Sequence, residues 1–133
     1  MRRILPFLLV SIVVVVAFVS HKTPTPAIGH GECNLNVSAS CALAEDVLLE
    51  VSPWPIEVEQ LHTLTITAEA QPEAKVEGMN MFMGYIPLVF EPKGASVWQA
   101  DLILGACAEP DMQWLMSLSQ GSNSYSIDFS THL

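Results

Sequence analysis

The chain has 133 residues, half of them hydrophobic, which is enough for one small domain. Its formal net charge is −9, and all 14 acidic residues lie after residue 21, accompanied there by only three lysines. This balance excludes nucleic acid as a partner, because binding to the phosphate backbone requires an excess of Lys and Arg. A solvated acidic surface is the commoner reason for such a composition, although negative charge also attracts cations and basic partners.

The N-terminus has the features of an exported protein. Arg2 and Arg3 precede an apolar run over residues 4–19, and a basic segment followed by a hydrophobic one is typical of a signal for export. No small-x-small cleavage site follows the run directly, so we expect residues 1–21 to remain as a single transmembrane helix rather than to be cleaved as a signal peptide. The arginines should stay on the cytoplasmic side. The sequence therefore predicts a bacterial inner-membrane protein whose C-terminal part lies in the periplasm.

Residues 22–45 are predicted to form a tether and a small cysteine loop. Proline, glycine, serine and asparagine are frequent in this segment, as they are in irregular connections. Cys33 and Cys41 should pair as a disulfide in an oxidising compartment, which leaves Cys107 unpaired. The alternative is that Cys33 and Cys41 bind a metal together with His30.

Short segments with alternating apolar residues follow from residue 46 onward. In one of them Leu64, Ile66 and Ala68 alternate with polar neighbours, which is the pattern of a half-buried strand. Residues rich in proline, glycine and asparagine separate these segments. About seven short strands with turns between them predict that residues 46–133 form an antiparallel β-sandwich. The expected strands are residues 47–51, 62–70, 76–83, 88–91, 97–104, 112–119 and 124–129.

Three of the six methionines fall within residues 79–83. In a strand over residues 76–83, Met79, Met81 and Met83 would stand in a row on one face, because strand side chains alternate between faces. Packing in the core is the simplest explanation of such a row, since methionine fills irregular gaps. However, a β core prefers Val and Ile on such a face, and this chain uses both elsewhere.

Sulfur in this half of the chain also predicts a copper site. Soft thiolate and thioether ligands select Cu(I) among biological metals. Further sulfur follows in the next expected loop and strand, and Trp114 could cover the ion by a cation–π contact. The predicted Cu(I) ligands are Met79, Met81, Met83, Cys107 and Met112.

Four features of residues 46–119 come in a characteristic order. A strand that ends in the methionine-rich turn is followed by a strand carrying Trp98, a loop with a sulfur residue and a strand carrying Trp114. This order resembles the FixH-like and YtkA-like group of small membrane-anchored domains. The resemblance implies an immunoglobulin-like sandwich behind the anchor, a role in copper handling, and a partner in copper delivery or cytochrome oxidase assembly. Tyr85 stands where such domains often have a histidine, and Cys107 where they have a methionine.

The sequence predicts no enzymatic activity. It holds no Gly-x-Ser-x-Gly elbow, phosphate-binding glycine loop or His-Glu-x-x-His motif. Cys107 and His62 could form a nucleophile and a base, but nothing in their spacing supports this, and a lone histidine is more often a surface residue. Two classes of function therefore remain open: a periplasmic Cu(I)-binding accessory protein, and a metal-free anchored module that docks a membrane-protein partner through methionine and aromatic side chains. The aromatic residues of that second surface would be Phe82, Tyr85, Trp98 and Trp114.

Overall fold

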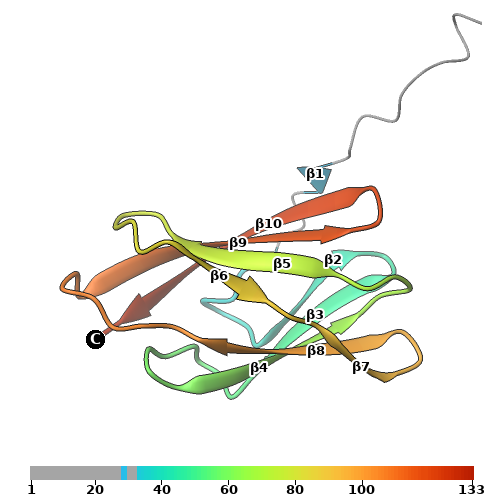
Figure 1. The fold of residues 1–133 in the computed structure, drawn as a ribbon, viewed down its shortest axis with the longest axis horizontal. Helices are drawn as coiled ribbons and strands as arrows, with labels where there is room; N and C mark the ends of the chain where they lie inside the picture. The colour runs from blue at the N-terminus through green and yellow to red at the C-terminus, as the bar shows by residue number, and fades with distance from the viewer. Residues whose placement is uncertain (1–27, 30–32) are drawn as a thin grey trace, which may run out of the picture.

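The computed structural model describes residues 28–29 and 33–133, which form two stacked β-sheets (Figure 1). One sheet has the strand order β1-β10-β9-β5-β6 and the other the order β2-β3-β4-β8-β7. Every neighbouring pair is antiparallel except β1 with β10. The ten strands of this part of the chain are β1 (Ile28–Gly29), β2 (Ser40–Ala44), β3 (Val47–Ser52), β4 (Leu61–Thr67), β5 (Glu73–Gly78), β6 (Tyr85–Leu88), β7 (Glu91–Gly94), β8 (Val97–Ile103), β9 (Asp111–Gln120) and β10 (Asn123–His132).

The all-β antiparallel sandwich is confirmed, but the expected number of about seven strands was too low. Strand β2 lies inside the segment expected to be a tether, and the strand expected at residues 88–91 is divided between the end of β6 and the start of β7. All three are outer strands of their sheets. An outer strand need not show a regular apolar face, and all four residues of β7 are exposed.

The predicted anchor, residues 1–21, lies outside the described residues, and so does the tether up to residue 27. Within residues 28–29 and 33–133, no helix is long and apolar enough to cross a membrane.

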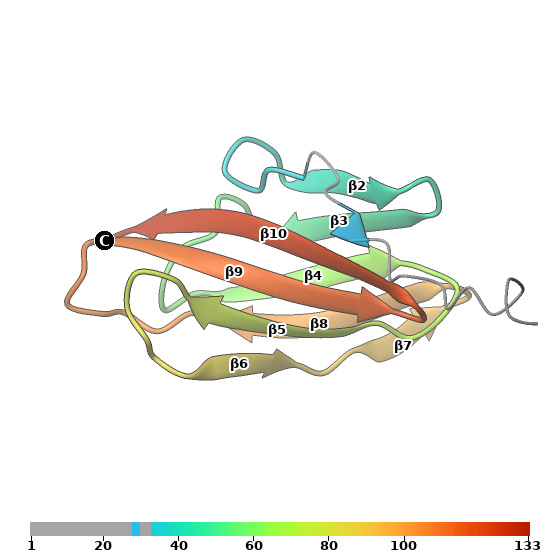
Figure 2. The same ribbon diagram turned by 90° about the horizontal axis from the view of Figure 1, so that it is seen from above.

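Alternation of side chains across the strands builds the core between the two sheets. In β4, Leu64 and Ile66 are fully buried while Thr65 between them is partly exposed. In β9, Trp114 and Met116 are buried on the inner face. Figure 2 shows the long β9–β10 hairpin lying over β3 and β4, so these inward side chains meet those of the other sheet. Burying one such Leu or Ile contributes about 1.5–3 kcal/mol.

The two ends of the sandwich carry different parts of the chain. Strand β1 pairs with the first residues of β10, so the described chain enters at that end. The opposite end, which we call the loop end, holds the loops 53–60, 79–84 and 104–110 together with the C-terminus (Figure 1). The backbone N–H of Glu59 donates to the carbonyl oxygen of Leu104 at 2.7 Å, which ties the first of these loops to the third.

Candidate functional site

The methionines lie in a loop rather than on a strand. Strand β5 ends at Gly78, so the expectation of one strand over residues 76–83 is wrong in its second half. A Cβ atom added at Gly78 would collide with the carbonyl oxygen of Met81. The absence of a side chain therefore lets the chain fold back over Gly78. Because the three methionines come after this bend, they do not stand in a row on one strand face. We call residues 79–84 the methionine loop.

Asn80 fastens the methionine loop to the start of β9. Its Nδ2 donates to the carbonyl oxygen of Asp111 at 2.7 Å, and its Oδ1 accepts from the backbone N–H of Gln113 at 3.0 Å. The backbone N–H of Met79 donates to the carbonyl oxygen of Gln113 at 2.8 Å. The side-chain amide of Asn80 thus takes the place of a backbone residue in the β5–β9 ladder, and the loop is held although it is not a strand.

The three methionines of the loop differ in exposure. The side chain of Met79 is 58% exposed and that of Met83 is 45% exposed. Met81 is half-buried and packs against the core. Core packing therefore accounts for Met81 but not for Met79 or Met83.

The other predicted sulfur ligands lie next to this loop. Met112 is buried, and its Cε lies 3.1 Å from the position of a Cβ added at Gly78, beneath the loop. The Cε of Met83 lies 3.8 Å from the Cβ position of Gly105, two residues before the half-buried Cys107. The structure thus brings the methionine loop next to Met112 and to the loop that carries Cys107. Among the described residues, no three His, Cys, Asp or Glu side chains form a group that could hold a metal ion, so a metal here would depend on thioethers.

Neither Trp98 nor Trp114 is an exposed side chain. Trp114 is buried, and its Nε1–H donates to Oγ1 of Thr131 at 2.9 Å. Trp114 and Met79 both line a hollow of about 290 Å³ on this sheet. Trp98 is half-buried, and its Nε1–H donates to the carbonyl oxygen of Ala68 at 3.1 Å. Of the four aromatic residues expected on an interaction surface, Phe82 and Tyr85 are exposed, to 88% and 66% respectively.

His62 is fully buried, so the expectation of a surface histidine is wrong. It occupies an inward position of β4, where it alternates with Thr63. Its Nδ1–H donates to the carbonyl oxygen of Pro53 at 2.8 Å, and its Nε2 accepts from the backbone N–H of Glu57 at 3.1 Å. Both nitrogens hold the loop 53–60, which leaves neither to serve as a base for Cys107.

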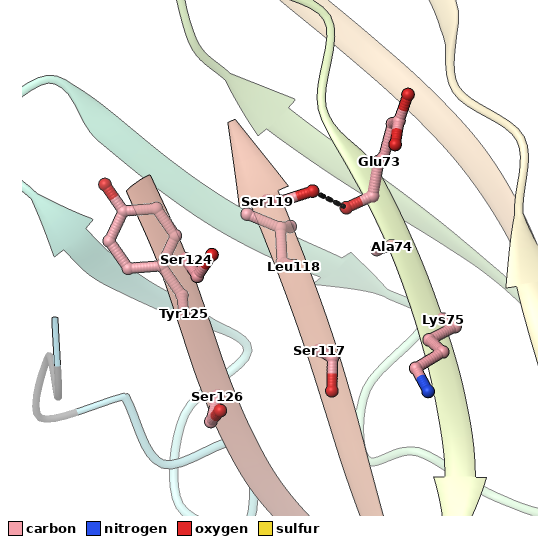
Figure 3. A pocket seen from close by; sticks show the side chains of 9 residues that line it. All are labelled: Glu73, Ala74, Lys75, Ser117, Leu118, Ser119, Ser124, Tyr125 and Ser126. Atoms are coloured by element: carbon pink, nitrogen blue, oxygen red, sulfur yellow. Dashed lines mark hydrogen bonds between the residues drawn. The ribbon is translucent and has the colours of Figure 1, made fainter. Parts of the chain in front are cut away.

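Another, larger hollow lies away from the sulfur, on the outer side of β5, β9 and β10 near the end where the described chain enters (Figure 3). It has a volume of about 500 Å³ and is shallow. Ser119 donates from its hydroxyl to the carbonyl oxygen of Glu73 at 3.5 Å. Sequence reasoning missed this hollow, because alternate serines on a strand have the pattern of an ordinary solvated face. Its lining residues are Glu73, Ala74, Lys75, Ser117, Leu118, Ser119, Ser124, Tyr125 and Ser126.

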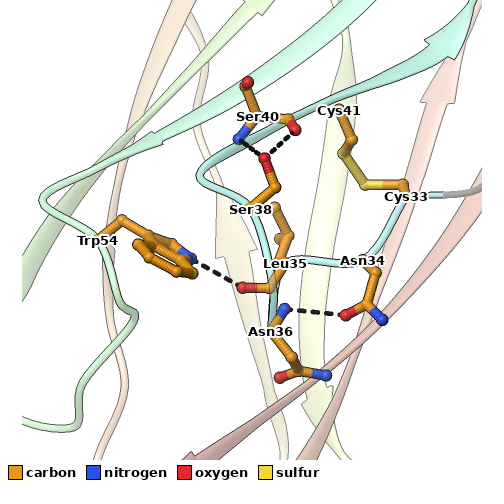
Figure 4. The surroundings of a disulfide bond; sticks show 8 residues. All are labelled: Cys33, Asn34, Leu35, Asn36, Ser38, Ser40, Cys41 and Trp54. Atoms are coloured by element: carbon orange, nitrogen blue, oxygen red, sulfur yellow. Dashed lines mark hydrogen bonds between the residues drawn. A yellow bond between two sulfur atoms is a disulfide. The ribbon is translucent and has the colours of Figure 1, made fainter.

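The predicted disulfide is confirmed: Cys33 and Cys41 are joined, and Cys107 is free (Figure 4). His30 lies outside the described residues, and the two sulfur atoms bind each other rather than a metal. The loop between them is docked on the sandwich, since Leu35 is buried and its carbonyl oxygen accepts from Nε1–H of Trp54 at 2.9 Å. Residues 33–41 are therefore part of the domain and not of a tether.

Comparison with models of protein families, with curated proteins and with solved structures finds no match for this chain. The resemblance to the FixH-like and YtkA-like group therefore remains a prediction from the residues named above, and function must be argued from the site itself.

Proposed function

We propose that this protein is a membrane-anchored periplasmic accessory protein that binds Cu(I) through the sulfur atoms of the methionine loop. The observation that carries the proposal is the exposure of Met79 and Met83 in a loop that is held by the hydrogen bonds of Asn80. Exposed thioethers contribute little to packing, whereas they are good ligands for a soft cation. The anchor over residues 1–21, the immunoglobulin-like character of the sandwich and a role in copper delivery or cytochrome oxidase assembly belong to the same proposal.

The proposed ligands come from two adjoining loops and from the strand beneath them. Met79, Met81 and Met83 supply neutral thioethers that bind without losing a proton. Cys107 and Met112 are the candidates to complete the set, the first two residues after Gly105, which Met83 approaches, and the second beneath Gly78. Because the loop is already fastened to β9, binding would order fewer residues than it would in a mobile segment, which favours affinity.

The surrounding charge is compatible with a cation. The described residues include only two lysines, Lys75 and Lys93, and each is paired with a glutamate on its own strand. Glu109 and Asp111 flank the start of β9 near the methionine loop. A negative field of this kind raises the local concentration of cations, although it does not distinguish copper from other metals. Selectivity for Cu(I) would come from sulfur.

Titration of the full chain with Cu(I) under anaerobic conditions, against a chromophoric Cu(I) chelator, tests the proposal. We expect the double variant Met79→Leu and Met83→Leu to lose most of the affinity, because leucine keeps the size and apolarity and removes both exposed sulfurs. The matched control is Met116→Leu, which removes one sulfur from the buried inner face of β9 and should bind as the wild type does. Equal affinity of the double variant and the wild type would overturn the proposal and leave the metal-free interaction module.

A further inference from the structure

Exposed apolar side chains gather at the loop end from both sheets. Leu61 and Ile103 are direct partners at the ends of β4 and β8, and each is more than half exposed on the outer face. Gly105 follows Ile103 by two residues, and Met83 reaches it with its Cε. Phe82, next to Met83, is the most exposed large hydrophobic residue of the described chain. We call Leu61, Phe82, Met83 and Ile103 the apolar face.

Three exposed acidic residues lie near the apolar face. Asp101 is exposed and lies two residues before Ile103, on the same outer side of β8. Glu59 is tied to Leu104 by its backbone N–H, and Glu109 is exposed in the loop after β8. Of the two lysines of the described residues, Lys75 lies on β5, while Lys93 on β7 is paired with Glu91 and lines one hollow with Asp101. Carboxylates near the apolar face therefore outnumber lysines, and the one lysine beside them is already paired with a glutamate.

We infer that the loop end is a docking face for a partner protein whose own contact surface has an apolar centre and a rim of Lys and Arg. Exposed apolar groups rimmed by polar residues are typical of interaction sites, and complementary rim charges guide association and exclude wrong partners. The inference does not depend on copper binding, because it rests on side-chain exposure and charge and not on sulfur.

Three other occupants of the apolar face fit less well. A second copy of this chain would bring two groups of carboxylates together, which is unfavourable. A membrane surface rich in anionic lipid would meet the same repulsion. The hydrophobic residues 4–19 precede β1, which pairs with the start of β10 at the opposite end of the sandwich. Charge complementarity therefore favours a basic protein surface.

Site-specific photo-crosslinking of the full chain in its native host tests this inference. A photoreactive benzoylphenylalanine is placed at Phe82 or at Ile103, and at Leu48 as a control, because Leu48 is 40% exposed but lies at the start of β3, beside Thr67 at the end of the sandwich opposite the loop end. We expect the first two positions to give an adduct with the same protein and Leu48 to give none. The crosslinked peptide of the partner should come from a surface rich in Lys and Arg.

Charge reversal separates this docking from non-specific capture. The double variant Asp101→Lys and Glu109→Lys should abolish the adduct at Phe82, whereas the double variant Glu69→Lys and Glu73→Lys, with the same change of charge at the other end, should leave it unchanged. If thermal melting shows the first variant to be unfolded, Asp101→Asn and Glu109→Gln replace it, with a several-fold loss of adduct expected.

Four results would overturn the inference. These are a dimer of this chain as the main adduct, an adduct with lipid or with residues 4–19, equal crosslinking at Leu48, and an adduct that is unaffected by the charge changes at Asp101 and Glu109. Met83→Leu keeps the apolar face and removes a proposed copper ligand, so it should retain the adduct. If the wild-type chain crosslinks normally but fails to bind Cu(I), the proposed function is refuted and the docking face is left intact.

Discussion

Removing the side chain of Asn80 should release the methionine loop from β9. In Asn80→Ala, the carbonyl oxygen of Asp111 and the backbone N–H of Gln113 lose the partners that now lie at 2.7 and 3.0 Å. Both groups can turn to water because this part of the surface is exposed, so each bond should contribute only its net value of about 0.5–1.5 kcal/mol. The free energy of opening the methionine loop should therefore fall by about 1–3 kcal/mol, which raises the equilibrium constant for opening by a factor of about 5–150.

Hydrogen exchange at the backbone N–H of Gln113 measures this opening directly. We expect its protection to drop by that factor in Asn80→Ala. In Asn80→Asp the drop should be smaller, because a carboxylate can still accept from Gln113 although it cannot donate to the carbonyl of Asp111. Asn123→Ala, a change of another exposed asparagine at the start of β10, is the control and should leave Gln113 unchanged. Unaltered protection in Asn80→Ala would refute the argument that this side chain holds the loop.

Three further predictions follow from the same end of the molecule and from the cysteines. Gly78→Ala should lower the melting temperature, because overpacking costs about 1–3 kcal/mol of stability. Gly94→Ala should not, since a Cβ there meets nothing within 4 Å, and equal melting temperatures of the two variants would contradict the collision between a Cβ at Gly78 and the carbonyl oxygen of Met81. Alkylation of the unreduced protein should label Cys107 alone, and mass spectrometry that finds label on the disulfide pair would disprove the assignment. If Cys107 is a ligand, Cu(I) affinity should fall by about tenfold for each unit by which the pH is lowered, because protons compete for its thiolate. Cys107→Ser should remove this pH dependence, and identical pH profiles of the two proteins would take Cys107 out of the ligand set.

The central strands could be predicted from the sequence because burial acts on alternate residues. Leu64 and Ile66 are both apolar and both fully buried, and their polar neighbours are not. The methionine loop shows where this reasoning fails. Met79, Met81 and Met83 continue the alternation, but the bend at Gly78 depends on how close the carbonyl of Met81 comes in space. Periodicity carries no information about such an approach.

His62 illustrates a second limit of the sequence. Its inward position follows from the alternation with Leu64, but its burial is favourable only because Pro53 and Glu57 supply hydrogen-bond partners. Those partners lie in a loop whose course is not encoded by any local pattern. The exposure of Phe82 and the approach of Met83 to Gly105 likewise depend on the packing of two loops and could be found only in the structure.

The pairing of β1 with the start of β10 sets how far the methionine loop can reach. From Ser124, beside β1, to His132 at the loop end, β10 rises by about 27 Å at 3.4 Å per residue. Residues 22–27 can span at most about 20 Å. In a protein anchored through residues 1–21, as proposed, the sandwich itself would thus supply more of the height above the bilayer than the segment before it. With the hairpin upright on the membrane, the loop would stand off the bilayer by the length of β10, at the level of the exposed part of a neighbouring membrane protein.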